Sequence, residues 1–288
     1  NIPKKNIHLP LKPESKNLIE DNIRFFLADN GFAEVINYPF SASSGKNSIQ
    51  VDNPLDSNRK FLRTNLMDSL ADNLIYNEKR QKDSIKLFEI SDVYTSDMSK
   101  IYKKLSIIVS GRQGHNYKEF GIQLDQKFLI NLFKPLGLDI NKEVIEISRN
   151  ELDSKIKTKI YGIEIELNKI SKFFEKYKPI SNPDGGYIQY KPISEFPCST
   201  RDLSFLVEKS SKISEVINRL DSVNANNLKE FFMFDFYENK TKNHTKIGYR
   251  FVFQSFDKTL TDLEIDDQIK PIIDSVLKID SVSLPGIK

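Results

Sequence analysis

Six side chains in the last third of the chain are of types that bind unpaired nucleic-acid bases. An aromatic ring or a guanidinium plane on a β-sheet can stack against a base, while neighbouring polar groups hydrogen-bond the base edges. We therefore predict an RNA-facing surface formed by Arg201, Ser204, Asp235, Tyr237, Arg250 and Gln254. The alternative for each residue is an ordinary surface side chain or an internal ion pair. Asp202 and Asp235 could both neutralise Arg250, and Arg201 could instead fix a domain junction.

The elements that would position these residues form one small domain between residues 195 and 286. Polar–apolar alternation and aromatic-rich runs predict strands at 201–208, 228–237, 247–254 and 281–284. Apolar stripes predict one helix at 212–223 and another after Thr261, which can cap it while Glu264 reaches back to the cap. This order predicts a ferredoxin-like βαββαβ arrangement, with both helices on one face of an antiparallel sheet and the other face open.

Alternation along the strands predicts which side chains reach each face of that sheet. The set expected to point toward the helices is Leu203, Phe205, Val207, Phe232, Phe234, Phe236, Tyr249, Phe251 and Phe253. The set expected on the open face is Asp202, Ser204, Leu206, Met233, Asp235, Tyr237, Arg250, Val252 and Gln254.

The first 190 residues carry helical and strand patterns in a mixed order. The helical patterns lie at 14–30, 66–75, 126–136 and 170–178, and the strand patterns at 32–40, 87–90, 105–111 and 159–167. Gly31 is expected to end the first helix, and Asn65 to cap the second. Glu164 and Glu166 share one strand face, where we expect them to be solvated. The Pro- and Gly-containing cluster at 182–186 predicts an interdomain turn.

Motifs of familiar enzyme reactions are missing from the sequence. It lacks a P-loop, a Gly-x-Ser-x-Gly elbow and a histidine pair with metal-ligand spacing. The stretch Gly111-Arg-Gln-Gly-His115 could hold a phosphate, but the pattern is weak and we interpret it as a surface loop. The single cysteine, Cys198, excludes an internal disulfide and a cysteine-built metal site, which fits a reducing cytoplasm.

The composition is that of a globular protein with two domains of ordinary size. The chain has 288 residues, 39% of them hydrophobic, and a net charge of +3. From residue 191 onward there are 14 basic and 15 acidic residues, which argues against tight, non-specific phosphate binding by that part. No apolar run approaches the ~20 residues of a membrane helix, so we expect no membrane partner.

Several short motifs of the C-terminal third occur in a fixed order. They are Phe196-Pro-Cys-Ser-Thr-Arg-Asp-Leu203, Phe234-Asp-Phe-Tyr237, Thr259-Leu-Thr-Asp262 and Glu264. This series resembles the anticodon-binding ferredoxin-fold domain that ends bacterial phenylalanyl-tRNA synthetase β subunits. One departure is that Leu284 is followed by Pro285, where the family often has arginine, so a basic contact usual there is not carried over.

Motifs of the first part resemble the catalytic-like module of the same β subunits. They are Val51-Asp-Asn-Pro-Leu55, Phe61-Leu-Arg-Thr-Asn-Leu66, Asn77, Arg80 and Leu87-Phe-Glu-Ile90. The helix followed by a strand that ends near Pro39 also resembles motif 1 of class II synthetases, a subunit-interface element. For Arg63 we prefer a structural role, in which it pairs with a carboxylate and holds its loop. The opening Asn1-Ile-Pro3 resembles an internal boundary of the family, so we expect a piece of a longer protein.

The resemblance implies an α+β fold of two domains. Residues 1–190 would be a class II synthetase-like antiparallel sheet with flanking helices, and residues 191–288 a ferredoxin-like βαββαβ anticodon-binding domain. Active class II enzymes have an arginine beside a glutamate in motif 2 and another arginine after a glycine-rich turn. Here Lys86 and Leu87 precede Phe88-Glu89, and 159–191 has no Gly-x-Gly followed by arginine. The first domain is therefore expected to be non-catalytic.

The partners implied by the resemblance are the catalytic α subunit and tRNA(Phe). ATP and magnesium would bind to the α subunit, so no cofactor is expected on this chain. The function implied is support of the α subunit and recognition of the tRNA anticodon region during aminoacylation. Two other hypotheses are a free-standing RNA-binding or assembly module without an enzymatic partner, and an autonomous adenylating enzyme.

Overall fold

The computed structural model describes residues 15–42, 48–95, 100–150, 152–180, 190, 192–239 and 244–285. The chain divides into two compact units that are each built from more than one segment. Unit 1 comprises Asn1–Tyr76, Ile85–Ser110 and Asp125–Gly185, and unit 2 comprises Asn77–Ser84, Gly111–Leu124 and Gly186–Lys288.

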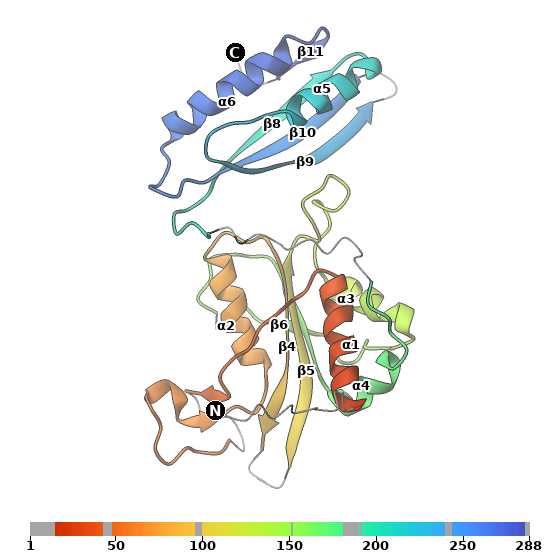
Figure 1. Ribbon diagram of the computed structural model, residues 1–288, viewed down its shortest axis with the longest axis vertical. Coiled ribbons are helices and arrows are strands. Elements are labelled where there is room, and N and C mark those ends of the chain that lie inside the picture. Colours follow the sequence, from red (N-terminus) through yellow and green to blue (C-terminus); the bar gives the residue numbers. More distant parts are fainter. Residues whose placement is uncertain are drawn as a thin grey trace, which may run out of the picture. The chain divides into compact units, whose positions relative to one another are not determined.

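Unit 1 is organised around a five-stranded, mainly antiparallel sheet (Figure 1). Its strand order is β1 (Ala33–Glu34), β4 (Ser84–Tyr94), β5 (Ile101–Gly111), β7 (Ile160–Glu166) and β6 (Ile145–Ile147). Strand β7 pairs antiparallel with β5 and β6, whereas β1 runs parallel to β4. A separate two-stranded ladder joins β2 (Phe40–Ser41) to β3 (Phe61–Leu62), close to the short 3-10 helix η1 (Ser57–Arg59).

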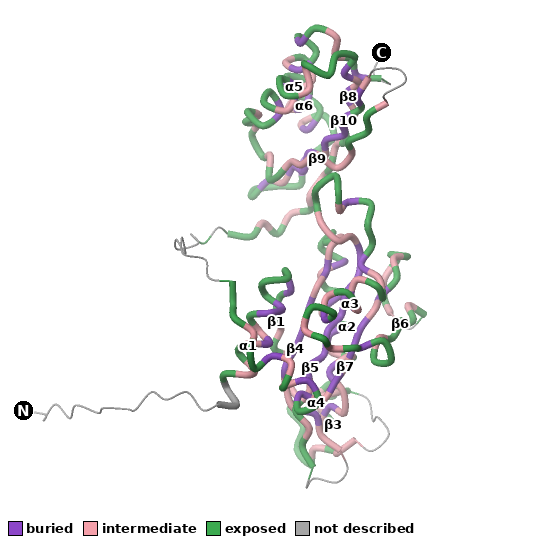
Figure 2. The backbone as a smooth tube through the Cα atoms, turned by 90° about the vertical axis from the view of Figure 1, so that its right-hand side faces the viewer, coloured by how far each residue is buried: buried purple, intermediate pink, exposed green. Residues whose placement is uncertain are grey.

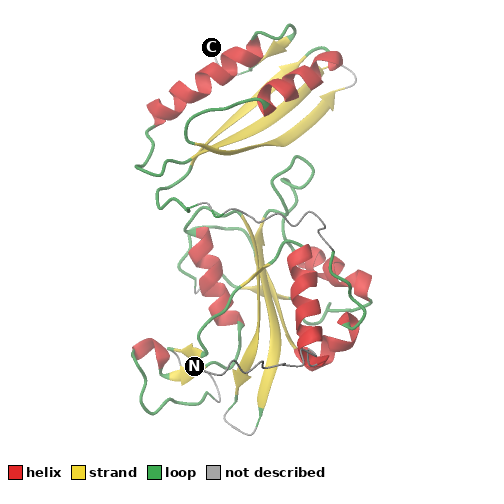
Figure 3. Ribbon diagram, viewed as in Figure 1, coloured by secondary structure: helices red, strands yellow, loops and turns green. Residues whose placement is uncertain are grey.

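Helices cover both faces of the unit 1 sheet (Figure 3). One face carries α2 (Met67–Glu78), which packs Leu70 and Leu74 against Ile108 and Ile160. The other face carries α1 (Ser15–Asp29), α3 (Gln126–Phe133) with the 3-10 turn η2 (Lys134–Leu136), and α4 (Leu167–Phe174). Phenylalanine rings at positions 26, 133 and 174 meet between these helices, with centroids 5.4–6.5 Å apart. In Figure 2 buried residues follow strands β4, β5 and β7 of this sheet.

Local signals at the helix ends behave as the sequence predicts. Gly31 has φ +79° and ends α1, where the Phe32 amide bonds back to the Leu27 carbonyl at 3.0 Å. The Asn65 side chain accepts from the Asp68 amide at 2.9 Å and caps α2. The strand expected at 32–40 is much shorter, because the Glu89 carboxylate, rather than a neighbouring strand, accepts from the Asn37 backbone amide at 3.4 Å.

The prediction that Glu164 is solvated is wrong. Its carboxylate accepts from the backbone amides of Leu66 at 2.8 Å and Met67 at 3.2 Å, at the N-terminus of α2. Lys104 forms a further ion pair with it at 2.7 Å. A carboxylate at this position satisfies otherwise unpaired amides and interacts favourably with the helix dipole. Glu164 therefore joins β7 to α2.

Unit 2 contains the βαββαβ order that the sequence predicts. The elements are β8 (Ser199–Val207), η3 (Ser210–Lys212), α5 (Ile213–Asp221), β9 (Leu228–Asn239), β10 (His244–Phe253), α6 (Asp262–Leu277) and β11 (Val282–Ser283). The sheet order is β11-β8-β10-β9, with every pairing antiparallel. The capping box of Thr261 and Glu264 is present at the start of α6. The predicted α+β class, with a ferredoxin-like domain after a mainly antiparallel sheet, is confirmed.

Candidate nucleic-acid interface

Strands β8 and β10 present the faces that alternation predicts. The side chains of Leu203, Phe205, Val207, Ile247, Tyr249, Phe251 and Phe253 are buried in the core with the two helices. The opposite face of these strands therefore carries Asp202, Ser204, Arg250 and Val252.

The predicted orientation of β9 is wrong over its central residues. Phe231 and Met233 pack against the helix-side core, whereas Phe232 and Phe234 lie on the opposite face. The cause is the irregular pairing of β9 with β10. The register of this pair shifts between Gly248 and Tyr249 and again between Val252 and Phe253. After the first shift Asp235 pairs with Gly248 and Tyr237 with Lys246, which returns both to the face of Arg250, as expected.

The face opposite the helices is not left open, because residues 112–122 of unit 2, here called the aromatic strap, cover part of it. His115 stacks on Phe232 with a centroid distance of 4.9 Å and an interplanar angle of 14°. Phe120 lies 5.3 Å from Phe234. The expectation of a bare sheet face is therefore corrected over β9, and these ring faces are engaged by the chain itself rather than left to stack on bases.

Arg250 is held in place by this arrangement. Its guanidinium forms two hydrogen bonds with the Asp202 carboxylate, at 2.8 and 2.7 Å, and this pair raises the pKa of Arg250. The same guanidinium lies 5.0 Å from the centre of the Phe120 ring and 5.7 Å from that of Phe234. The internal ion pair considered as an alternative for Arg250 is thus present, with Asp202 as the partner.

Arg201 does not lie on the predicted face. It shares the side of β8 that faces the helices and forms ion pairs with Asp262 at 2.7 Å and Asp266 at 3.0 Å, both on α6. The reason is alternation itself, since Arg201 is two residues from the buried Leu203. Its position ties the first turn of α6 to the sheet.

The other predicted residues differ in how far they are engaged. The Gln254 side chain donates to the Phe196 carbonyl at 2.6 Å. Ser204 and Asp235 are partly exposed, and Tyr237 is 57% exposed at the end of β9. Tyr237 is therefore the most exposed member of the predicted set.

The glycine-containing loop at 111–115 binds protein groups. Gly111 has φ +93°, and the Arg112 amide donates to the Asp83 carbonyl at 2.6 Å. The His115 ring lies 2.9 Å from the Asp83 carboxylate, and this hydrogen bond raises the pKa of His115 and lowers that of Asp83. The loop anchors the aromatic strap to Asp83, which agrees with its interpretation as a surface loop.

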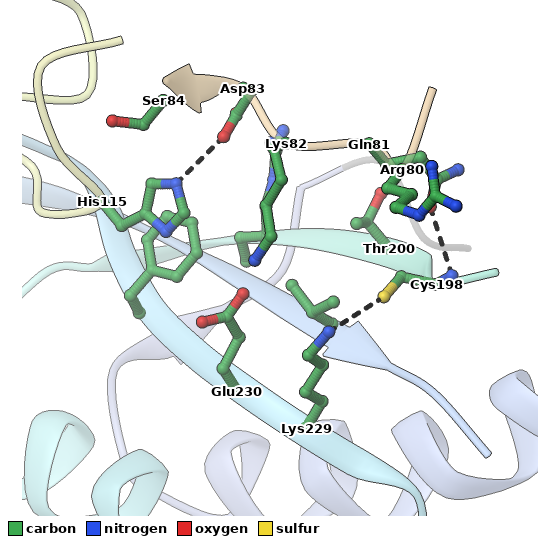
Figure 4. A pocket seen from close by; sticks show the side chains of 13 residues that line it. Arg80, Gln81, Lys82, Asp83, Ser84, His115, Cys198, Thr200, Lys229 and Glu230 are labelled. Atoms are coloured by element: carbon green, nitrogen blue, oxygen red, sulfur yellow. Dashed lines mark hydrogen bonds and ion pairs between the residues drawn. The ribbon is translucent and has the colours of Figure 1, made fainter. Parts of the chain in front are cut away.

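A pocket of about 360 Å³ lies beside the aromatic strap in unit 2 (Figure 4). It is lined by Arg80, Gln81, Lys82, Asp83, Ser84, His115, Cys198, Thr200, Lys229, Glu230, Phe232, Arg250 and Val252. Sequence reasoning missed the contribution of Lys82 and Lys229 to this site. The run Lys79-Arg80-Gln81-Lys82 at the end of a predicted helix was the available signal.

Arg63 has the structural role that the sequence predicts. It forms an ion pair with Glu89 at 2.7 Å, and the two side chains are 4% and 2% exposed. It also donates to the Ser91 hydroxyl at 2.5 Å and the Asp92 carbonyl at 3.1 Å. This arginine is therefore fully used in fixing β3 against β4.

The other arginines described in unit 1 are also held by local partners. Arg24 pairs with Glu34 at 2.8 Å, Arg59 with Asp56 at 3.3 Å, and Arg149 donates to the Thr158 backbone. Among the described residues no group of three His, Cys, Asp or Glu side chains could hold a metal ion. Nor does any described helix have the length and apolar character needed to cross a membrane.

Two family models match consecutive parts of the chain. Residues 2–151 match the phenylalanyl tRNA synthetase beta chain CLM domain, and residues 194–284 match the ferredoxin-fold anticodon binding domain. The first match alone spans more than half of the chain. The chain belongs to the phenylalanyl-tRNA synthetase beta chain family.

Curated relatives agree with this family. The chain is 30% identical to the chloroplastic phenylalanine–tRNA ligase beta subunit of Porphyra purpurea, over 96% of this chain and 43% of that protein. It is 28% identical to the beta subunit of Legionella pneumophila (strain Lens), over 90% of this chain and 37% of that one. The chain thus spans less than half the length of the beta subunits that it matches.

Similarity to solved structures is weaker. Pyrrolysyl-tRNA synthetase from Desulfitobacterium hafniense aligns with a TM-score of 0.36 and 14% identity, covering 53% of this chain and 66% of that one. That score is too low to support an argument about the fold.

Proposed function

We propose that the chain acts as a non-catalytic part of a phenylalanine–tRNA ligase β subunit. In this proposal residues 1–190 form a catalytic-like module that supports the catalytic α subunit, and residues 191–288 recognise the anticodon region of tRNA(Phe). The observation that carries it is the order of the two family matches, on a chain whose second part has the βαββαβ fold. The local partners of the described unit 1 arginines add support, because adenylation needs positive groups aimed at the reacting phosphate.

The α subunit is the protein partner in this proposal, and it would bind ATP and magnesium. Exposed apolar side chains near β2 and η1 suit a protein partner, since such groups mark interaction surfaces when they gather. Ile36, Tyr38 and Leu55 are 92%, 71% and 81% exposed. The Arg59 guanidinium lies 4.8 Å from the centre of the Tyr38 ring, which links the two ends of this group.

The RNA contacts in this proposal come from the part of the sheet face that the aromatic strap does not cover. Ser204, Asp235 and Tyr237 are accessible, whereas Arg250 would have to exchange its pairing with Asp202 to read a base edge. We expect Arg250→Ala to weaken tRNA binding less than the ~1–3 kcal/mol of a base-reading arginine. Arg201 and Gln254 remain predictions with intramolecular partners in the structure.

The test is reconstitution with a purified α subunit from a related ligase. The mixture should attach phenylalanine to tRNA(Phe), and this chain alone should show no phenylalanine-dependent pyrophosphate exchange. Exchange by the chain alone would establish an autonomous adenylating enzyme and contradict the proposal. RNA binding without any association with α would favour the free-standing RNA-binding module.

The cellular location belongs to the proposal as well. We propose the cytoplasm, as for a bacterial ligase, although chloroplast β subunits are among the relatives. Immunolocalisation in the source organism tests this directly.

A further inference from the structure

The pocket beside the aromatic strap has two walls of different origin. Residues 80–84 form one wall, and the other consists of side chains from β8, β9 and β10, among them Thr200, Lys229 and Val252. In Figure 4 the side chains of Lys82 and Lys229 extend into the same space from opposite walls. Two ammonium groups thus converge on one volume of about 360 Å³.

Most other charges of the lining are already neutralised. Arg250 pairs with Asp202, and Asp83 pairs with His115 at 2.9 Å and with Arg112 at 3.3 Å. Among the described residues, the Lys229 ammonium donates only to the Cys198 sulfur, at 3.4 Å, and neither Lys82 nor Lys229 forms a salt bridge. Glu230 is the carboxylate of the lining that remains to oppose the two lysines. The two lysines outnumber this carboxylate, so the charge of the lining favours the binding of an anion.

The shape and chemistry of the lining fit a phosphate better than a base. The Phe232 ring is covered by His115, so that a base cannot stack on the covered side. Lysine acts on phosphate as a compact point charge, and the hydroxyls of Thr200 and Ser84 can donate to phosphate oxygens. The part from residue 191 onward has 14 basic and 15 acidic residues. Its contacts with the phosphates of an RNA backbone must therefore be few and local.

We propose that Lys82 and Lys229 bind a phosphate of the RNA backbone in this pocket, with Glu230 limiting the strength of the contact. The proposal deepens the proposed function and rests on it. The pocket would position the tRNA, while sequence is read on the accessible part of the sheet face.

The test measures tRNA(Phe) affinity of the complex with the α subunit over a range of salt from about 50 to 200 mM. One phosphate contact contributes a slope of about −0.7 to −0.9 in log K against log salt, or roughly fivefold to eightfold at about 0.1 M salt. Lys82→Ala and Lys229→Ala should each weaken binding by up to this factor and flatten the slope. The loss should be equal for cognate and non-cognate RNA, because phosphate carries no sequence.

Two further variants make the test specific. Glu230→Gln should strengthen binding, since it removes the opposing charge and keeps the shape of the side chain. Lys270→Ala, at an exposed position on α6, serves as the matched control and should change neither affinity nor slope. Thermal unfolding of each variant establishes that it is folded.

The results that would overturn the proposal are distinct from those that would overturn the proposed function. Unchanged affinity and slope in both lysine variants, with the wild-type complex binding tRNA, would refute the pocket alone. AMP binding that Lys82→Ala abolishes, with tRNA affinity unchanged, would assign the pocket to a small phosphate ligand instead. Failure of the wild-type complex to bind tRNA would refute the proposed function, and the pocket's role with it.

Discussion

Arg63 and Glu89 have almost no access to water, so each side chain depends on the other for neutralisation. Removing one partner of such a pair leaves an uncompensated buried charge, which typically costs about 3–5 kcal/mol. We expect Arg63→Ala to lower the free energy of unfolding by that amount, measured by urea denaturation. The control is Arg59→Ala, whose ion pair is exposed and should contribute less than about 1 kcal/mol. Similar losses in the two variants would contradict the structural role of Arg63.

The pair of His115 and Asp83 makes the stability of unit 2 depend on pH. The folded pKa of His115 is raised above 6.5, mainly by its hydrogen bond with Asp83, so its stabilisation is complete below 6.5 and is lost as pH rises through the folded value. The folded pKa of Asp83 is lowered below 3.8, mainly by the same bond, so its stabilisation is present above 3.8 and is lost on further acidification. Together they contribute most between about pH 4 and 6.5.

Urea denaturation from pH 5.5 to 8.5 tests this pH dependence. The free energy of unfolding should fall more steeply with rising pH in the wild-type chain than in His115→Gln. His244→Gln, a change in β10, should retain the wild-type slope. A wild-type slope in His115→Gln would show that the pair does not form.

Residue types are easier to predict than residue partners. The strand position of Arg250 identifies it as a candidate, but its partner Asp202 lies 48 residues away and is only one of two candidates from sequence. Glu164 caps α2 across about 100 residues of chain, for which the local sequence holds no signal. Partners at such distances are set by packing of the elements and not by the pattern within one element.

Helix ends, in contrast, are specified within a few residues. The Thr261 cap accepts from the Glu264 amide. The Glu264 carboxylate accepts hydrogen bonds from Lys258 and Thr261, which lower the pKa of Glu264 to about 2. We expect Thr261→Ala to lower the free energy of unfolding by about 1 kcal/mol, the usual loss for a missing cap. Thr259→Ala, at an exposed position outside the helix, should change it by much less. Equal effects on urea denaturation would argue against the cap.

The orientation of β9 could not be predicted, because both of its faces carry aromatic residues. Phe231, Phe232, Met233 and Phe234 are consecutive, so that alternation does not distinguish core from surface. The register shift beside Gly248 then decides which β9 side chains face the helices. A Cβ added at Gly248 would lie 2.9 Å from the Asp235 Cβ and 3.0 Å from the Phe234 ring. Only glycine allows this close approach of the two strands.

Gly111 is required at the end of β5 for a similar reason. Its φ of +93° is strained for other residues, and a Cβ there would lie 2.0 Å from the Asp83 carbonyl oxygen. Gly111→Ala should therefore lower the free energy of unfolding by more than about 1 kcal/mol. Gly121→Ala is the control, because a Cβ added at that position would meet no atom within 4 Å. Denaturation curves that shift equally for both variants would contradict this role.

At the scale of the whole molecule, the order and type of the elements could be predicted, but the covering of the second sheet could not. Residues 112–122 lie between two elements of unit 1 in sequence, yet they pack on β9 in unit 2. Loop sequences carry little information about what they cover, whereas the βαββαβ order follows from patterns inside each element.

Under the proposed function, binding of the α subunit should stabilise the folded chain. A partner that binds only the folded state adds about 2.7 kcal/mol at a free concentration 100 times its Kd. The melting temperature should therefore rise with added α subunit, as followed by differential scanning fluorimetry. Ile36→Asp combined with Leu55→Asp should abolish this rise, whereas Ile145→Asp on β6, which is 49% exposed, should retain it. A shift that survives the double change would place the α contact elsewhere.

The discontinuous make-up of unit 2 matters to anyone who transplants this ferredoxin-like fold into another protein. Cutting the chain just before β8 would leave the aromatic strap behind and expose the rings of Phe232 and Phe234 to water. A graft that keeps its solubility must therefore include a substitute for the strap or polar replacements at those two rings.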